Sequence, residues 1–186
     1  MPHDTRTRMI EATVAALQRH GVAGMSFTEI LDASGAARGA IYHHFPGGKT
    51  QLVAEAAARN AQDIRAQLAA LPAATPRTVA QAFLTLVRPV MQQSARGGGC
   101  AVAALTIRAE AAAANDELRQ VADAALASWT DQLTERLTTS GLGADPASDL
   151  AVTLITLLEG AHVMCRAAGT VKPFDQAARA TTQLFE

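Results

Sequence analysis

The 186-residue chain is 49% hydrophobic and 18% charged, so it has ample material for a packed core and its composition excludes a disordered protein. Its net charge of −1 gives no overall signal for nucleic acid, and its two cysteines exclude the disulfide framework of a small secreted protein. Aromatic residues make up only 4%, and the abundance of alanine, the best helix former, favours an all-α protein.

The first predicted helix runs from about Asp4 to His20. Ile10, Val14 and Leu17 recur at helical spacing on one face. The glycine at position 21 is a natural stop. The pattern therefore predicts an amphipathic helix whose apolar face packs on the helices that follow.

Two short helices with a tight turn between them are expected next. In the segment "SFTEILDASG", Ser26 or Thr28 can cap the start of a helix, and Glu29 completes a capping box with Ser26. Gly35 suits the left-handed turn that ends this helix. The following helix is expected from about Ala37 to Phe45, because Pro46 cannot continue it. Two such helices joined by a glycine-containing turn are typical of a helix-turn-helix.

The rest of the chain predicts about six more helices, which gives about nine in total. Their approximate ranges are 49–71, 77–94, 100–114, 118–137, 146–168 and 174–184. We therefore expect an all-α protein with two parts: a helix-turn-helix domain over residues 1–50 and a larger helical domain over residues 51–186.

The predicted helix over residues 146–168 is apolar on nearly every side. Glu159, His162 and Arg166 nevertheless interrupt it too often for a bilayer span. No charged-then-apolar leader opens the chain. We therefore expect a cytoplasmic protein with no membrane partner.

The segment "GAIYHHFPGGKT" ends like the phosphate-binding loop G-x-x-x-x-G-K-[ST] of nucleotide-binding proteins. Two features argue against that function: residue 43 is His where the loop needs Gly, and no strand precedes the segment. A glycine pair followed by Lys49 at a predicted helix start still suits an anion, because free backbone N–H groups and the positive end of the helix dipole lie there.

The second helix of the predicted helix-turn-helix suits the major groove of DNA. Small residues on its front face, among them Ala37 and Gly39, let the backbone approach the base edges. Arg38 is the one long hydrogen-bonding side chain there, and it can pair bidentately with guanine.

The spacing of these residues resembles the DNA-binding domain of the TetR family of transcriptional repressors. The matching residues are Thr28, Gly35, Gly39, Ile41, Tyr42, His44, Phe45, Lys49 and Leu52. The resemblance covers about the first 55 residues, although Leu31 stands where the family usually has a small alanine. The link "FPGGK" is one residue longer than the common F-x-x-K, and with the later "GGGCAVAAL" it is similar to the LmrA/YxaF-like branch, whose members repress drug-efflux genes.

The resemblance implies a DNA-binding surface made of Thr28, Ala37, Arg38, Gly39, Tyr42, His43, His44 and Lys49. Within it, Thr28, Tyr42 and Lys49 would contact DNA phosphates. Arg38, Gly39 and His43 would face the major groove. Three alternatives stay open: Tyr42 as a core aromatic, Lys49 as a merely solvated side chain, and the two histidines as a metal pair. Adjacent helical residues point about 100° apart, so we expect no metal site.

In the larger domain, the resemblance implies a ligand pocket and a dimer interface. The candidates to line the pocket are Phe83, Val87, Met91, Cys100, Leu105, Trp129, Leu133, His162 and Met164. A tryptophan and methionines suit a bulky apolar ligand, although ordinary core packing explains each residue equally well. His162 and Glu159 within an apolar helix are the stronger hints, because a buried polar group needs a partner.

The dimer interface is expected on the stripe formed by Leu150, Leu154, Leu157 and Ala161, together with the final helix. The alternative is a central core helix in a monomer. In a dimer, two helix-turn-helix motifs about 34 Å apart read a pseudo-palindromic operator in double-stranded DNA.

The sequence therefore predicts a homodimeric repressor that a small apolar or amphipathic effector releases from DNA, and that controls an efflux or detoxification gene. We expect no catalytic residues and no cofactor. The alternative class is a helical thiol-dependent enzyme, with Cys100 as nucleophile and His162 as base, or a small-molecule binding module without DNA binding. Redox sensing by Cys100 and Cys165 is a further alternative.

Overall fold

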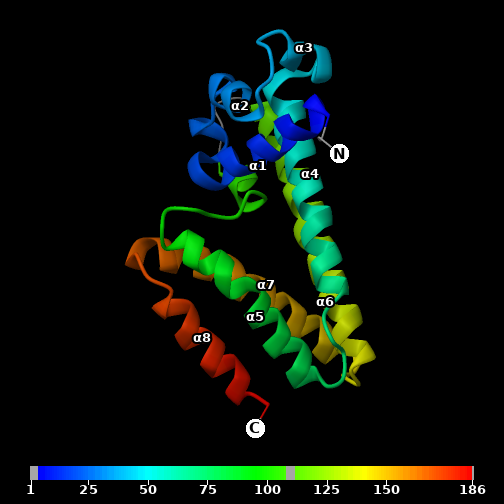
Figure 1. The fold of residues 1–186 in the computed structure, drawn as a ribbon. Helices are drawn as coiled ribbons and strands as arrows, with labels where there is room; N and C mark the ends of the chain where they lie inside the picture. Colours follow the sequence, from blue (N-terminus) through cyan, green and yellow to red (C-terminus); the bar gives the residue numbers. More distant parts are fainter. Residues whose placement is uncertain (1–3, 108–111, 186) are drawn as a thin grey trace. The chain divides into compact units, whose positions relative to one another are not determined.

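The computed structural model describes residues 4–107 and 112–185, except the side chains of residues 112–115. Within these residues the chain is all-helical, with eight α-helices, one short 3-10 helix and no strand (Figure 1). The elements are α1 (Thr5–Gly24), α2 (Phe27–Ser34), α3 (Ala40–His44), α4 (Gly48–Ala69), α5 (Pro76–Ser94), η1 (Ala103–Thr106), α6 (Ala112–Thr139), α7 (Ala144–Ala168) and α8 (Lys172–Gln183). The predicted all-α class is confirmed, with one helix fewer than the nine expected.

The chain forms two compact units. The first unit comprises residues 1–62 and 100–125, and the second unit comprises residues 63–99 and 126–186. The helices α4 and α6 each contribute residues to both units. The predicted boundary at residue 50 differs from the division into these two compact units, and it stays a prediction.

The first two helices begin with side-chain caps, of which Ser26 is the one that the sequence predicts. The Asp4 side chain accepts a hydrogen bond from the Thr7 N–H at 2.8 Å, and the Ser26 hydroxyl accepts one from the Glu29 N–H at 3.2 Å. Gly21 interrupts α1 with a left-handed φ of 65°, at the position where the sequence predicts the helix to stop.

The core of the first unit includes apolar side chains of α1 to α4, and of the link after α3, that are at most 1% exposed. They are Met9, Ala16 and Leu17 of α1, Ile30 of α2, Ile41 of α3, and Leu52, Val53, Ala56 and Ala57 of α4, together with Phe45 in the link after α3. Short helices such as α2 and α3 are marginal alone, so this shared core is what holds them in place.

The predicted helix over residues 100–114 is wrong over residues 100–107, whereas residues 112–114 are helical as the start of α6. After Cys100 the chain makes a turn and then only the short η1. The Thr106 hydroxyl bonds back to the Ala103 carbonyl at 2.7 Å, and Ile107 is extended, so the helix does not propagate. Residues 108–111 of this prediction lie outside the described residues.

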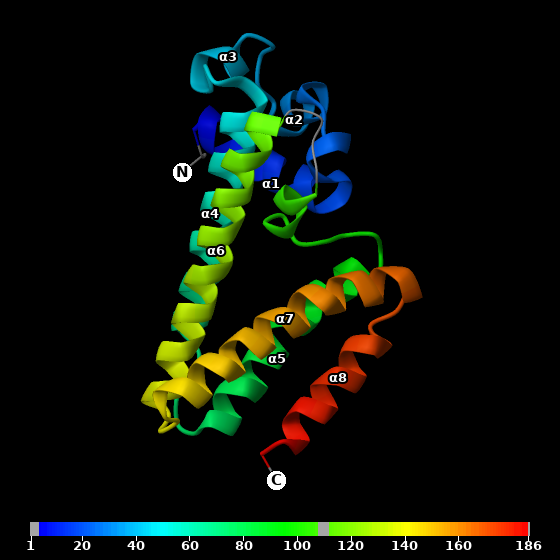
Figure 2. The same cartoon turned by 180° about the vertical axis from the view of Figure 1, so that it is seen from behind.

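In the second unit, α5, α7 and α8 pack against one another (Figure 2). Thr75 caps α5 by accepting from the Thr78 N–H at 3.1 Å, and Pro76 occupies the first helical turn, where its missing N–H costs nothing. Among the described helices, α7 is the one whose length and hydropathy would suit a bilayer span. One face of α7 is buried in the core with α5 and α8, which is the arrangement of a core helix.

Candidate functional site

The candidate site begins with the turn between α2 and α3 in the first unit. Gly35 takes the left-handed conformation there, with φ 65°, and its N–H bonds to the Asp32 carbonyl. The Arg8 Nε of α1 donates to the Ser34 carbonyl at 2.8 Å, which fixes the last turn of α2. These contacts give the helix-turn-helix that the sequence predicts.

Most of the predicted DNA-binding residues lie on the surface of this helix-turn-helix. Thr28, Ala37, Arg38, Gly39, Tyr42 and His43 are exposed, and His44 and Lys49 are half-buried. The structure begins α3 at Ala40, so Ala37, Arg38 and Gly39 lie in the turn before the helix instead of inside it. The Ala40 N–H closes this turn on the Ala37 carbonyl at 2.9 Å.

Arg38 differs from the other arginines of the helix-turn-helix. Arg6 forms an ion pair with Glu55, and Arg19 forms one with Glu29. Within residues 4–107 and 112–185 no carboxylate pairs with Arg38. Its guanidinium is therefore available to an external acceptor without the loss of an internal bond.

Tyr42 is 67% exposed, and its ring meets Phe27 edge-on at a centroid separation of 6.2 Å. The alternative of a core aromatic is therefore wrong for Tyr42. The aromatic that fills the core at this point is Phe45, which is fully buried beneath the Arg6 guanidinium. The edge-on contact with Phe27 orients the Tyr42 ring and leaves most of its surface in solvent.

Lys49 has an internal role that sequence reasoning missed. Its Nζ donates to the Met25 carbonyl at 2.9 Å, so the beginning of α4 is tied to the junction between α1 and α2. The alternative of a merely solvated lysine is therefore wrong. An ammonium group has three donors, so this bond leaves capacity for a phosphate.

The glycine pair before Lys49 does not provide the free amides that the sequence suggests. The Gly47 N–H donates to the Gln51 side chain at 2.7 Å, and the Gly48 N–H donates to the Phe45 carbonyl at 2.9 Å. Gly48 also has φ 68°, which explains why the longer link needs glycine there. An anion at this place would therefore depend on Lys49 rather than on these two amides.

The predicted pocket residues fall into three groups. Phe83, Val87, Met91, Trp129, Leu133 and His162 are buried in the second unit, whereas Leu105, also buried, and the half-buried Cys100 belong to the first unit. Met164 is 60% exposed, so it does not share the interior position expected for it. The burial of the first group fits a core as well as a pocket lining, so the pocket stays a prediction.

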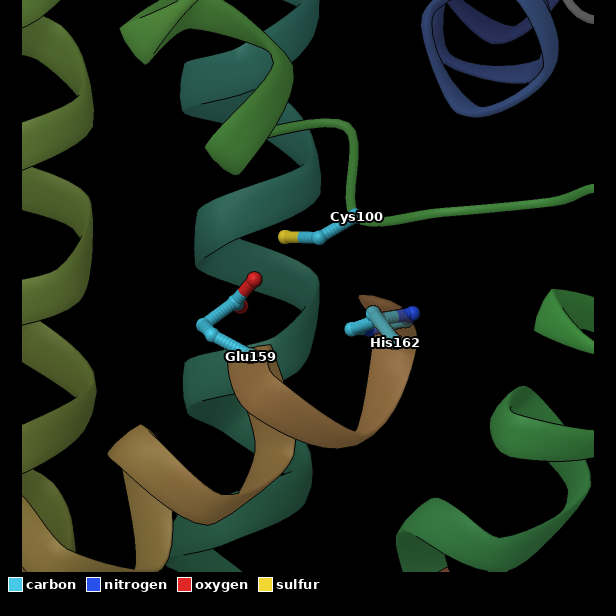
Figure 3. A group of neighbouring side chains, drawn as sticks. All are labelled: Cys100, Glu159 and His162. Atoms are coloured by element: carbon cyan, nitrogen blue, oxygen red, sulfur yellow. The ribbon is translucent and has the colours of Figure 1, made fainter. Parts of the chain in front are cut away.

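His162 has a clear internal partner. Its Nδ1 lies 2.7 Å from the Ser94 Oγ, and that hydroxyl also lies 3.1 Å from the Val90 carbonyl. A hydroxyl has one proton, so if it donates to the carbonyl, the proton of a neutral His162 is on Nδ1. Figure 3 shows His162 and Glu159 on successive turns of α7.

Burial lowers the pKa of His162 from 6.5 to about 4, and the positive charge of Arg166 adds to the effect. Between these values the unfolded chain binds more protons than the folded one, so stability should fall as pH drops from about 6.5 to about 4, by up to about 3 kcal/mol. Urea unfolding at several pH values gives the free energy of unfolding as a function of pH. The slope of this free energy against pH should be smaller for His162→Gln than for wild type. Equal slopes of free energy against pH for wild type and His162→Gln would contradict the lowered pKa of His162.

The predicted dimer stripe lies mainly on the inner side of α7. Leu154 and Ala161 are 0% and 7% exposed within the single chain, and Leu150 and Leu157 are half-buried. The large apolar side chains that α7 leaves exposed are Val152, Val163 and Met164, at 51%, 69% and 60%. Sequence periodicity detected the apolar character of α7 but not which face meets its own core.

The comparisons with known proteins agree on one class. Residues 9–56 match the model of bacterial regulatory proteins of the tetR family, and residues 76–180 match the C-terminal domain of LmrA/YxaF-like transcriptional regulators. The HTH-type transcriptional regulator LmrA of Bacillus subtilis (strain 168) is 28% identical over 172 residues, which cover 91% of this chain and 90% of that protein.

Two further similarities are narrower: one covers only part of this chain, and the other shows the fold alone. The probable acrEF/envCD operon repressor of Escherichia coli (strain K12) is 45% identical over 51 residues, or 27% of this chain and 23% of that protein. The crystal structure of a TetR transcriptional regulator from Legionella pneumophila superposes with a TM-score of 0.81 at 19% identity, covering 100% of this chain and 99% of that chain.

Proposed function

The chain belongs to the TetR family of bacterial transcriptional regulators, with a C-terminal domain of the LmrA/YxaF-like type, and we propose that it is a homodimeric repressor that a small ligand releases from its operator. The observation that carries the proposal is the exposed Arg38 in the turn before α3, whose guanidinium has no carboxylate partner among the described residues. A guanidinium in that position suits bidentate recognition of guanine in the major groove.

In the proposed complex, α3 faces the major groove and the residues around it hold the DNA backbone. Arg38, Gly39 and His43 face the base edges beside the small Ala37. Thr28, Tyr42, His44 and Lys49 contact phosphates, which contribute affinity without sequence preference. The exposure of Thr28 and Tyr42 supports this division.

Dimerisation increases the length of the DNA sequence that the protein recognises. One helix-turn-helix reads only a few base pairs, whereas a two-fold dimer reads two half-sites of a pseudo-palindrome. The exposed apolar side chains of α7 support an interface on this helix, since water-exposed valine and methionine gain free energy when a partner covers them. We place Val152, Val163 and Met164 at its centre, with the predicted Leu150 and Leu157 at its margin.

The effector is proposed to be a small apolar or amphipathic molecule that binds among the predicted pocket residues of the larger domain. The helix α4 supports a route for the signal, because it begins at the end of the helix-turn-helix and continues into the second unit. A ligand that binds the released conformation better by about 1–3 kcal/mol would open the repressor. The proposed target is an efflux or detoxification gene, and the proposed location is the cytoplasm.

A gel shift with the DNA upstream of the protein's own coding region tests the DNA-binding part. The expected result is a salt-sensitive shift that an excess of unrelated duplex does not remove. A protein that shifts neither duplex would favour the alternative class, a thiol-dependent enzyme or a binding module without DNA.

Lys49→Ala separates the two roles proposed for this lysine. If Lys49 contacts phosphate in both protomers, the slope of log affinity against log salt should decrease by about two units per dimer. The lost bond to the Met25 carbonyl should lower stability by about 1–3 kcal/mol. Operator titrations at several salt concentrations measure the first effect, and urea unfolding measures the second. A normal salt slope in a destabilised protein would leave Lys49 with the internal role only.

A further inference from the structure

A groove separate from the predicted pocket residues lies between α5 and α8 in the second unit. Its volume is about 840 Å³, which is in the range of small-molecule sites. Its lining residues come from both helices, among them Leu84, Thr85 and Arg88 of α5 and Phe174, Asp175 and Arg179 of α8. Figure 1 shows these two helices in the lower part of the view. None of these residues is among those assigned to the DNA surface, the effector pocket or the dimer contacts of α7, although the final helix, α8, is expected to take part in the dimer interface.

The spacing of the lining residues explains the form of the groove. Those of α5 follow the steps of one helical face, and those of α8 do the same, so two parallel rows of side chains face a common space. The floor is apolar, because Leu84 and Phe174 are 6% and 1% exposed and Ala178 lies beside them on α8. Thr85 and Thr182 add hydroxyl groups to the walls.

The charges in the groove do not balance. Arg88 forms a bidentate ion pair with Asp175, with Nε–Oδ1 and Nη2–Oδ2 distances of 2.9 and 3.1 Å, which joins the two helices. Arg179 lies one turn after Asp175 and is exposed, and no carboxylate in the described part of the chain pairs with it. The groove therefore carries one uncompensated positive charge next to an apolar floor.

We propose that this groove is a second ligand site, for a small amphipathic monocarboxylate whose apolar tail covers Leu84 and Phe174 and whose carboxylate pairs with Arg179. A carboxylate matches the fork of donors on a guanidinium, and a single negative charge balances the single free positive one. The site is independent of DNA binding, because it uses only residues of α5 and α8.

Titration calorimetry with octanoate and its neutral analogue octanamide tests the proposal on the full-length protein. Octanoate should bind at least tenfold more tightly than octanamide. Arg179→Glu should weaken octanoate binding at least tenfold. Arg179→Lys should lose less affinity for octanoate than Arg179→Glu does, because lysine keeps the positive charge. The matched control is Arg96→Glu, an exposed arginine in the loop after α5, which should leave octanoate binding unchanged.

The contradicting outcomes are distinct from a failure of the proposed function. Equal affinity for octanoate and octanamide, or octanoate binding that Arg179→Glu leaves intact, would overturn the carboxylate site. A change of molar mass in Arg179→Glu, measured by light scattering, would instead assign the groove to a contact between subunits and overturn the proposal. Gel shifts on the same variant report separately on DNA binding, which should equal that of wild type.

Discussion

Replacing Arg38 with alanine should lower operator affinity by between about 30-fold and 10⁴-fold, and it should weaken the preference for operator over unrelated DNA. Each lost bidentate contact to a base costs about 1–3 kcal/mol, and a dimer loses two of them, so the total is about 2–6 kcal/mol. Stability should hardly change, because Arg38 is exposed and forms no ion pair with the described carboxylates.

Fluorescence anisotropy with an operator duplex and a scrambled duplex of equal length measures both effects. Arg19→Ala is the matched control, because it removes an arginine of the same unit whose guanidinium is already engaged by Glu29 at 2.9 Å. That variant should bind both duplexes nearly as wild type does. If Arg38→Ala weakened binding to both duplexes equally, Arg38 would contact phosphate. If the variant lost no affinity for either duplex, the recognition surface would lie elsewhere.

The second large effect is expected from Val163→Asp, which should convert the dimer to monomers and abolish operator binding at concentrations where wild type is saturated. Val163 is 69% exposed on α7, next to the exposed Met164. In a two-fold interface the substitution occurs twice, so two carboxylates would be buried without partners, which costs several kcal/mol. The fold should survive, because the residue is not part of the core of the single chain.

Light scattering after gel filtration measures the mass, and circular dichroism checks the fold. Val90→Asp is the matched control, since it places the same change at an exposed valine of α5 that is not among the proposed interface residues. A folded Val163→Asp dimer with normal operator binding would contradict the interface on α7. A folded Val90→Asp monomer would locate the interface on α5 instead.

The helix-turn-helix could be predicted from the sequence because its determinants are local. The cap of Ser26 on the Glu29 N–H, the left-handed Gly35 and the stop at Gly21 each depend on a few neighbouring residues, and the structure has all three. The family itself was predictable for the same reason, since its recognisable residues lie within one short segment.

Other features depend on contacts that no local pattern encodes. The bond of Lys49 to the Met25 carbonyl joins residues 24 positions apart, and the Ser94–His162 bond joins residues 68 positions apart. The later start of α3 has a local cause, a turn closed by Ala40 on the Ala37 carbonyl, but alanine-rich sequence favours helix equally well there.

The larger domain was predictable as helices but not as surfaces. A helix that is apolar all round, such as α7, presents several stripes of similar hydrophobicity, and only packing decides which stripe meets the core. Leu154 proves to face the core, and Val163 faces solvent. The α5–α8 groove could not be predicted from the sequence either. It requires two helices to lie side by side whose linking residues, Arg88 and Asp175, are 87 positions apart in the chain.

DNase I footprinting of the wild-type protein on the DNA upstream of its own coding region tests the central claim most directly. The expected result is protection of a pseudo-palindrome whose half-sites lie about 34 Å, or one helical turn, apart, with two protomers bound per site. Absence of protection at protein concentrations that coat unrelated DNA, or protection of a single half-site by one protomer, would contradict a dimeric, sequence-reading repressor.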